Sequence, residues 1–342
     1  MNNNQLDFAF VAELPTVSVP PKKRAPRKTM PPATPAASAA PAQDAESLAR
    51  VLETHPDYRV LRRLQPRLQW PPAADGQEVC RVVVLDTETT GLDQAKEKII
   101  ELALLRVDVD RATGLPVGEV QVYDGLEDPG IPIPKEIEGI TGISNAMVKG
   151  QRLDEARVAQ LLDGADLVIA HNAGFDRPFA EARLSRFREL AWACSFADIG
   201  WKDYGRGSAK LESLALEMGW FYDAHRAEMD CHALLAVLAA PLPGQAHTGL
   251  AQLVEQGRKP SYRLQATGAP FDAKDLLKAR GYRWNAEQKV WHTRLGDAEA
   301  LQAECDWLRT QVYRRAATVQ VETLDAMVRY SSRAGTVVQQ PL

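Results

Sequence analysis

Two carboxylates that stand two residues apart are the first side chains in this sequence that could do chemistry. They are Asp86 and Glu88, and they follow the apolar run Val82-Val83-Val84-Leu85. A short β-branched run predicts a buried strand, and residues i and i+2 of a strand point to the same face. Adjacent carboxylates repel unless a cation lies between them, and hard divalent cations prefer oxygen ligands. The pair therefore indicates either a metal site or a strand end at which two acids meet solvent.

Two later stretches carry residues of the same chemical type. Asp176 lies in Ala170-His171-Asn172-Ala173-Gly174-Phe175-Asp176-Arg177-Pro178-Phe179, and Asp230 ends His225-Arg226-Ala227-Glu228-Met229-Asp230. Taken in order with Asp86-x-Glu88, these stretches resemble the three motifs of the DnaQ-like 3′→5′ exonucleases of the DEDD class, histidine subtype. The string Asp86-Thr87-Glu88-Thr89-Thr90-Gly91 is particularly similar to proofreading members of that family.

The resemblance implies a role for each of five residues. Asp86 would bridge two metal ions, Mg²⁺ or Mn²⁺, and Glu88 and Asp230 would complete the site beside the nucleophilic water. Asp176 would support the second ion. His225 would take the proton of the water, because an unperturbed histidine pKa of roughly 6.5 suits a base near neutral pH. The other interpretation of His225 is a helix-capping residue.

The family also implies a substrate and products. Nucleoside 5′-monophosphates would leave from a 3′ end, most simply from DNA in replication proofreading or repair, with a DNA polymerase as a candidate partner. Four residues are expected to approach the terminal nucleotide, namely Thr89, Thr90, Gly91 and Phe175, with Leu102 and Met147 as further candidates. An RNA-trimming enzyme of the same fold stays open, because the scissile phosphate is the same and discrimination rests on the 2′-hydroxyl.

The elements that must position these residues follow from the apolar pattern. Strands are expected over residues 82–85, 99–109, 119–123 and 166–171, and helices over 154–162 and from about 172 onward. Asp176 then falls in the first turn of a helix, with Phe175 and Phe179 in the core. The alternation of strands and helices predicts an α/β fold with a mixed sheet flanked by helices. The family implies the same fold, the ribonuclease H-like one.

Composition shifts divide the chain into five parts. Residues 1–45 form a Pro- and Ala-rich tail without apolar periodicity, and 46–78 are predicted to form two short helices packed on the next domain. The exonuclease domain is expected over 79–240. A Pro- and Gly-containing linker follows over 241–260, and a small α+β accessory module occupies 261–330.

The small module offers a rival site of function. Its cations and two tryptophans could bind a single strand by charge and stacking, with Lys274, Lys278, Arg280, Arg283, Arg294, Trp284 and Trp291 as the candidates. The alternative is that the tryptophans form the core of a tiny domain. In a third interpretation the module carries the main binding function and the nuclease is tethered to it.

Composition limits the classes of protein to which this chain could belong. The chain has 342 residues, is 45% hydrophobic and 25% charged, and carries a net charge of −4, so the whole chain has no basic signature of a nucleic-acid binder. The four cysteines form no Cys-x-x-Cys pair, and three of them lie in apolar stretches and are expected to be buried thiols of a reducing compartment. No apolar run is long enough to span a membrane. A bacterial cytoplasmic protein is expected.

A short peptide near the N-terminus suggests one further partner. Gln5-Leu6-Asp7-Phe8-Ala9-Phe10 resembles the motif by which bacterial replication and repair proteins bind the sliding clamp. Gln5, Leu6, Phe8 and Phe10 would be its anchors. The alternative is an unstructured terminus with incidental aromatic residues.

Overall fold

The structure is a computed structural model that describes residues 44–342. The chain divides into two compact units, Met1–Val51 and Leu52–Leu342. The first contains most of α1 (Ala45–Glu53), and none of the residues of this helix is buried. The clamp-peptide residues Gln5, Leu6, Phe8 and Phe10 lie outside the described residues.

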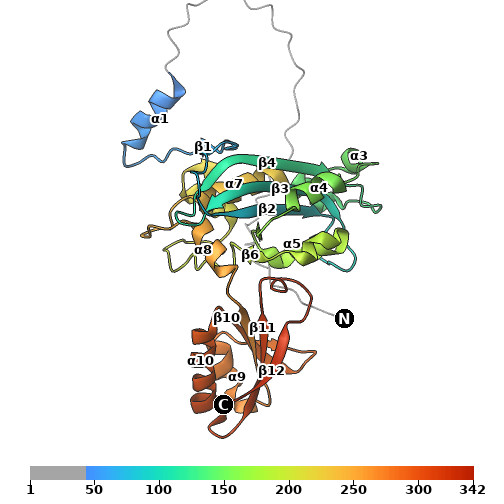
Figure 1. Ribbon diagram of the computed structural model, residues 1–342, viewed down its shortest axis with the longest axis vertical. Coiled ribbons are helices and arrows are strands. Elements are labelled where there is room, and N and C mark those ends of the chain that lie inside the picture. Colours follow the sequence, from blue (N-terminus) through green and yellow to red (C-terminus); the bar gives the residue numbers. More distant parts are fainter. Residues whose placement is uncertain (1–43) are drawn as a thin grey trace, which may run out of the picture. The chain divides into compact units, whose positions relative to one another are not determined.

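A mixed five-stranded sheet lies at the centre of the larger unit (Figure 1). Its order is β4-β3-β2-β5-β6, and the strands are β2 (Val79–Thr89), β3 (Ile99–Asp110), β4 (Pro116–Leu126), β5 (Leu167–Ala170) and β6 (Trp192–Cys194). β3 runs antiparallel to β2 and β4, whereas β5 runs parallel to β2 and β6. β2 is central because Val82 to Leu85 are apolar on both faces and wholly buried.

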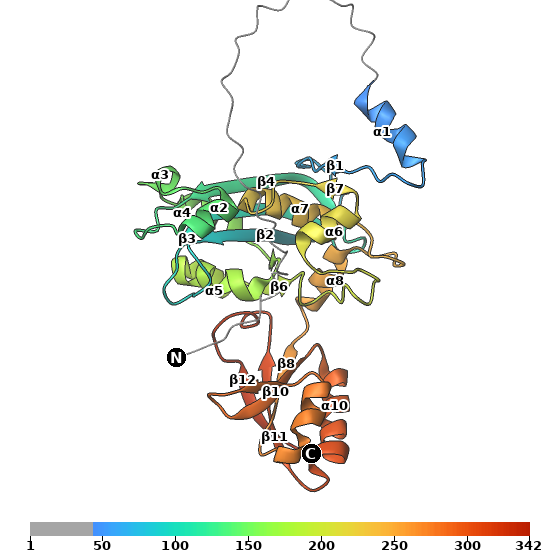
Figure 2. The ribbon, with the colours of Figure 1, turned by 180° about the vertical axis from the view of Figure 1, so that it is seen from behind.

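Helices cover both faces of this sheet (Figure 2). Val82 and Val84 pack in one core with α6 (Leu211–Glu217), α7 (Ala227–Ala239) and α8 (Gly249–Gln256). Val83 and Leu85 pack in a second core with α4 (Glu155–Leu162) and α5 (Ala173–Arg183). The predicted α/β fold, a mixed sheet flanked by helices, is confirmed.

Shorter elements lie at the edges of this domain. They are α2 (Lys135–Thr141), α3 (Asn145–Val148), a 3₁₀ turn (Ser185–Glu189) and β7 (Trp220–Phe221). Among the helices of the described residues, none has the length and apolar character needed to cross a bilayer. All four cysteines are buried free thiols, one more than predicted.

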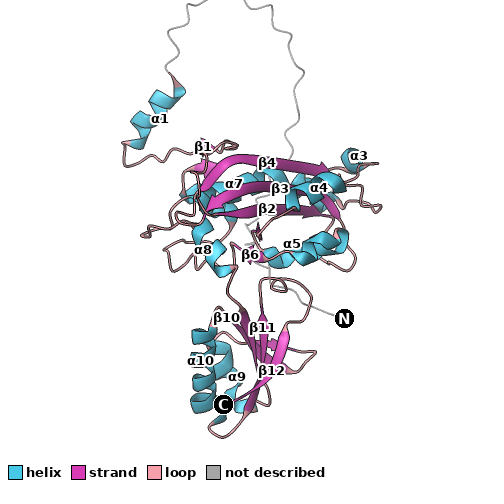
Figure 3. Cartoon of the chain, in the orientation of Figure 1, coloured by secondary structure: helices cyan, strands magenta, loops and turns pink. Residues whose placement is uncertain are grey.

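The C-terminal module is built on a second, antiparallel sheet (Figure 3). Its order is β12-β11-β8-β10-β9, and the strands are β8 (Ser261–Ala266), β9 (Arg283–Asn285), β10 (Val290–Leu295), β11 (Thr318–Leu324) and β12 (Thr336–Pro341). A short 3₁₀ turn (Phe271–Ala273) precedes α9 (Lys274–Ala279), and α10 (Ala298–Trp307) continues into a π-helical turn (Leu308–Tyr313). Residues of both helices share the module's core with β8 and β11.

The second helix expected within 46–78 is wrong. Residues 62 and 63 form β1 (Arg62–Arg63), which pairs in parallel with β7. The Arg62 amide donates to the Gly219 carbonyl at 2.8 Å, and the Leu64 side chain is buried. The spacing of apolar residues near Leu64 suits a helix. The segment is a strand instead, because its backbone pairs with β7, more than 150 residues further along the chain.

The linker expected over 241–260 is also wrong for residues 249–256. α8 occupies 249–256, where the Thr248 hydroxyl caps the helix by accepting from the Ala251 amide at 3.1 Å. Leu250 and Leu253 are wholly buried in the core beside α7. Pro241 and Gly244 mark a turn at the start of the segment, and the prediction extended that turn too far.

Candidate active site

Three carboxylates meet at the end of the central strand. Asp86 and Glu88 extend from one face of β2, and Asp230 comes from the first turn of α7. One carboxylate oxygen from each residue lies within 4.8 Å of the other two. Such a convergence of oxygen donors is the arrangement that a hard divalent cation binds.

Asp176 approaches the same strand from the opposite helix layer. It lies in the first turn of α5 and is almost fully buried. Its Oδ1 accepts hydrogen bonds from the Thr87 amide at 3.2 Å and the Thr87 hydroxyl at 2.8 Å. Thr87 stands between Asp86 and Glu88, so this contact fixes Asp176 beside the three other acids.

The chain just before α7 wraps around Asp230. Its Oδ1 accepts from the Tyr222 hydroxyl at 2.9 Å, and its Oδ2 accepts from the Arg226 amide at 3.1 Å. Between them, His225 is exposed and has a left-handed backbone with φ of 64°. Burial raises the pKa of Asp230, and the Tyr222 hydrogen bond and the charge of His225 oppose that rise, which places the imidazole within electrostatic reach of the site.

The electrostatics of the four acids show a lack of compensating positive charge. Burial, and then neighbouring carboxylates, raise the pKa of Glu88 to about 8. Burial raises the pKa of Asp176 to about 7 despite the hydrogen bonds from Thr87. Burial and the Asp176 carboxylate hold the pKa of Asp86 well above its usual range, and burial raises the pKa of Asp230. A bound divalent cation would supply the missing charge, so the donor set fits a metal.

A fifth acid was missed by the sequence analysis. Glu101 lies on β3 directly opposite Glu88 and is wholly buried. Its carboxylate accepts from the Arg226 guanidinium at 2.8 Å and from the Ala227 amide at 2.9 Å. Glu101 therefore neutralises the nearest arginine and anchors the start of α7, which carries Asp230. The sequence did hold a signal for Glu101, because a single acid within the apolar run 99–105 indicates a buried charge that needs a partner.

The residues expected at the terminal nucleotide lie in different settings. Thr89 and Thr90 are buried, and their hydroxyls donate to the Gly91 carbonyl and to the Glu97 carboxylate. Gly91 is half-buried in the same turn, and Phe175 is half-buried with its ring 5.1 Å from that of Phe179. Contact of these four with a nucleotide stays a prediction. Leu102 is wholly buried in the core, so the expectation of a contact there is wrong, whereas Met147 is exposed.

His171 is a structural residue at the end of β5. Its Nδ1 lies 2.7 Å from the Ser195 hydroxyl. Burial lowers its pKa to about 4, so the ring is neutral at physiological pH.

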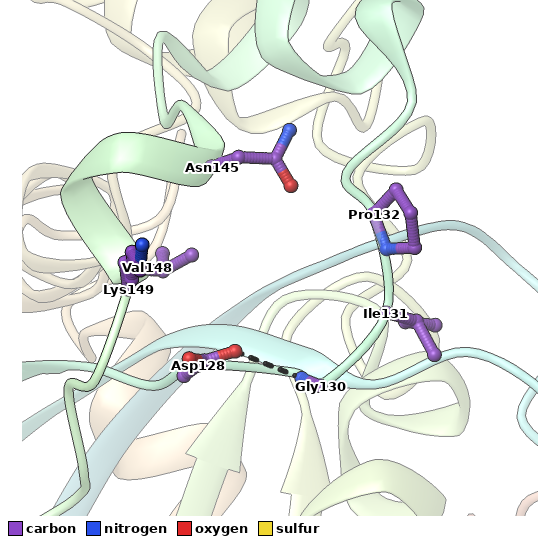
Figure 4. Close-up of a pocket in the computed structure, with 7 residues that line it drawn as sticks. All are labelled: Asp128, Gly130, Ile131, Pro132, Asn145, Val148 and Lys149. Carbon is purple, nitrogen blue, oxygen red and sulfur yellow. Dashed lines mark hydrogen bonds between the residues drawn. The ribbon is translucent and has the colours of Figure 1, made fainter.

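A cavity of about 430 Å³ is lined in part by residues of α3 (Figure 4). Its lining consists of Asp128, Gly130, Ile131, Pro132, Asn145, Val148 and Lys149. The polar groups there already have internal partners. The Asp128 carboxylate accepts from the Gly130 and Gly150 amides, each at 2.9 Å, and the Asn145 side chain accepts from the Ile133 amide. None of the five predicted catalytic residues lines this cavity.

Comparison with known proteins places the domain in a family. Residues 83–238 match the family model described as Exonuclease. This domain belongs to the exonuclease family. The resemblance drawn from the three motifs is therefore confirmed, and all five motif residues lie inside the matched range.

Curated relatives support the same assignment for this domain. The 3′-5′ exonuclease DinG of Bacillus subtilis is 34% identical over 164 residues, which is 44% of this chain and 16% of that protein. The DNA polymerase III subunit epsilon of Aquifex aeolicus is 33% identical over 108 residues, 31% of this chain and 50% of that protein. The chain thus spans half of these relatives or less. A crystal structure of E. coli exonuclease I with single-stranded DNA covers 69% of this chain and 68% of its own, with 17% identity and a TM-score of 0.43.

Proposed function

We propose that the exonuclease domain hydrolyses nucleic-acid phosphodiesters from the 3′ end and releases nucleoside 5′-monophosphates. One observation carries the proposal: Asp86, Glu88 and Asp230 converge within a domain of the exonuclease family, with Asp176 and His225 beside them. The curated relatives of this domain include a protein named as a 3′-5′ exonuclease.

The chemistry divides between a cofactor and the residues of the chain. Divalent ions, two Mg²⁺ or Mn²⁺ in this proposal, would stabilise the charge on both the attacking and the leaving oxygen of an in-line displacement. Asp86, Glu88 and Asp230 would hold the ions, and Asp176, fixed by Thr87, would support the second one. His225 would accept the proton of the attacking water from its exposed position before α7.

DNA in replication proofreading or repair is the proposed substrate. The support comes from the relatives, which include a subunit of bacterial DNA polymerase III. We accordingly propose that the protein acts together with a DNA polymerase in the bacterial cytoplasm. RNA remains the alternative substrate, because the catalytic groups would contact only the scissile phosphate, which DNA and RNA share.

The test uses the purified full chain with 3′-labelled substrates. Single-stranded DNA, a mismatched duplex and RNA are each incubated with Mg²⁺ and with chelator. We expect stepwise release of labelled mononucleotide from DNA with Mg²⁺, no release with chelator, and no release by Asp86→Ala or Asp230→Ala. Unchanged turnover in either folded variant would refute the assignment, and faster release from RNA would identify the alternative substrate.

The proposed clamp contact rests on the sequence alone. Gln5, Leu6, Phe8 and Phe10 would anchor an extended peptide in the groove of a bacterial sliding clamp. Calorimetric titration of the isolated peptide against the clamp tests this. Binding that is lost on Gln5→Ala with Phe8→Ala is expected, and equal binding by that variant would refute it.

The division of the chain stays a proposal with two adjusted boundaries. We propose that the catalytic unit runs from residue 79 to the end of α8, because Leu250 and Leu253 belong to its core. The accessory module then begins with β8 and extends beyond residue 330, because β12 is an edge strand of its sheet.

A further inference from the structure

One face of the C-terminal sheet carries a cluster of polar side chains. The strand register places Arg294 opposite Arg263, and His292 opposite both Gln265 and Arg283. It also places Gln320 opposite Gln265 and Glu322 opposite Arg263. Paired residues share a face, so these seven form one surface, here called the open face: Arg263, Gln265, Arg283, His292, Arg294, Gln320 and Glu322.

The other face of the same sheet is covered. Leu264, Ala266, Val319 and Val321 pack there in a core with residues of α9 and α10. Trp291 packs against that core, and Trp284 is its register partner at the edge, with ring centroids 5.5 Å apart. The candidate cations and tryptophans therefore divide between two sides of the sheet: the tryptophans and the lysines of α9 belong to the covered side, and Arg283 and Arg294 to the open face.

The open face has an excess of positive charge. Like charges directly opposite each other destabilise a sheet, yet Arg263 and Arg294 are cross-strand partners. The only acid of the open face is Glu322, which accepts from Arg263 at 2.8 Å and from the Gly335 amide at 2.8 Å. Among the ion pairs of the described residues, none involves Arg283 or Arg294.

His292 lies in the middle of this charge. Its ring is half-buried, and its Nδ1 is buried without a hydrogen-bond partner in the described structure. Burial lowers the pKa of His292, and Arg263, Arg294 and Arg283 lower it further. The three guanidinium groups therefore lie around one half-buried ring. Gln265 and Gln320 lie along the same row, but Gln265 is buried and its amide donates to the Gln288 side chain at 3.1 Å.

We propose that the open face binds the phosphodiester backbone of a nucleic-acid strand, separately from the acidic site. Unpaired guanidinium groups match phosphate oxygens in charge and geometry, and the half-buried Gln320 amide adds a neutral donor. The choice of nucleic acid among possible polyanions rests on the proposed function, which makes such a strand the substrate of this chain.

A segment of the module fixes the open face beside the exonuclease domain. Residues 325–333, between β11 and β12, supply the carbonyls of Ala326 and Met327, which accept from the buried Arg177 of α5 at 3.0 and 2.6 Å. The Tyr330 hydroxyl of this segment bonds to Asp198. Burial and then Arg263 lower the pKa of Arg294, and Tyr330 opposes that shift, which places Tyr330 near Arg294. A strand held on the open face is thus kept close to the catalytic domain, which raises its effective concentration there.

The experiment compares two double variants of the full chain that remove the same charge. Arg283→Gln with Arg294→Gln alters the open face, and Lys274→Gln with Lys278→Gln alters exposed positions on α9. Fluorescence anisotropy with labelled single-stranded and duplex DNA, in chelator, measures affinity over a range of salt. Each lost phosphate contact changes the salt slope by about 0.7 for a single strand, so two contacts weaken binding roughly 25-fold at about 0.1 M salt.

We expect this loss for the arginine variant alone, with recovery in Arg283→Lys with Arg294→Lys. Equal affinity of the arginine variant and the wild type, or equal losses in both glutamine variants, would overturn the proposal. Tighter binding of an acidic protein or peptide mixture than of DNA would overturn it in favour of another partner.

A second readout separates this proposal from the proposed function. The p-nitrophenyl ester of thymidine 5′-monophosphate is too small to reach beyond the acidic site. We expect all these variants to hydrolyse it at the wild-type rate, while the arginine variant requires more of a long strand to reach half-maximal rate. Failure of the wild type to cleave the ester refutes the catalytic proposal and leaves the binding measurement valid.

Discussion

At the residue scale, the four acids of the site are held close together by contacts that do not neutralise them. Thr87 and Tyr222 donate to Asp176 and Asp230, but a hydrogen bond does not remove the repulsion between carboxylates. The nearby cation Arg226 is bound to Glu101. Metal-free protein must therefore hold several acids in the protonated form or tolerate their repulsion.

This arrangement predicts a stability that falls as pH rises in chelator. The pKa of Glu88 is raised from 4.5 to about 8, and that of Asp176 from 3.8 to about 7. The folded state then binds more protons than the unfolded state between about pH 4 and 8, so the free energy of unfolding decreases with pH over that window. Urea unfolding at several pH values measures it.

Two controls define this effect. Asp176→Asn should flatten the pH dependence, whereas Asp275→Asn on the exposed surface of α9 should leave it unchanged. Saturating Mg²⁺ should stabilise the protein most at high pH, where the ligands are ionised. A metal-free wild type whose stability rises from pH 5 to 8 would contradict the prediction.

A general-base role for His225 predicts a selective loss of turnover. Removing a general base typically costs about 10²- to 10⁴-fold in rate. Because the residue has a positive φ, His225→Asn is the better variant, since asparagine tolerates that backbone more readily than alanine. Rate measurements over a range of Mn²⁺ concentration, with calorimetry of Mn²⁺ binding, should show slow turnover with unchanged metal affinity.

The exposed His247 supplies the matched control, and His247→Asn should behave as the wild type. Loss of metal affinity together with rate in the His225 variant would instead make the residue a ligand or a structural support.

The residues that sequence could predict are those whose own pattern carries the chemistry. Asp86 and Glu88 are recognisable because two acids follow a buried strand at a spacing that points them to one face. Glu101 was missed because its importance depends on Arg226, which lies 125 residues further along the chain. Pairing between distant residues leaves no local signal.

At the element scale, the same contrast explains which predictions succeeded. β2 and α5 follow from apolar runs and turn residues within a few positions. β1 forms only because its backbone pairs with β7. β11 and β12 belong to a sheet whose first strand, β8, begins more than 50 residues earlier. Such strands are short or have exposed sides, so their apolar pattern is weak.

α5 carries an interaction whose loss should be costly. Arg177 is wholly buried, donates to Glu181 at 2.7 Å and also bonds to carbonyls of residues 325–333. Arg177→Met leaves Glu181 and these carbonyls without that donor. Breaking a buried charge pair typically costs about 3–5 kcal/mol, so urea unfolding should show a loss of that order.

The exposed Arg186 gives the comparison. It pairs with Glu189 at 3.1 Å at the surface, where such a pair contributes about 0–1 kcal/mol. Arg186→Met should therefore be nearly silent. A loss of stability for Arg177→Met as small as that for Arg186→Met would show that the contact between α5 and residues 325–333 contributes little.

At the scale of the whole molecule, the exonuclease domain depends on chain that follows its family-matched range. The match ends at residue 238, but α8 fills the core behind α7, and residues 325–333 supply acceptors to α5. The sequence predicted a nuclease joined to an accessory module by a free linker. Sequence patterns locate apolar segments, but they do not say which core receives them.

This dependence predicts the outcome of two truncations. A chain that ends at Leu242 loses Leu250 and Leu253, and burying a leucine side chain contributes about 1.5–3 kcal/mol. That loss is a large fraction of a typical stability of about 5–15 kcal/mol. A chain that ends at Lys259 keeps α8 and loses only the module with its acceptors for Arg177.

We expect the chain ending at Leu242 to lack a cooperative thermal transition, and the chain ending at Lys259 to fold with reduced stability. Circular dichroism melts and urea titrations measure both. The chain ending at Lys259 should still hydrolyse the p-nitrophenyl ester, because it keeps the four acids and His225. Its affinity for long strands should fall, because it lacks the open face. Equal unfolding midpoints for the two truncations would mean that α8 is dispensable, and the free linker predicted from sequence would then describe the molecule better than a shared core.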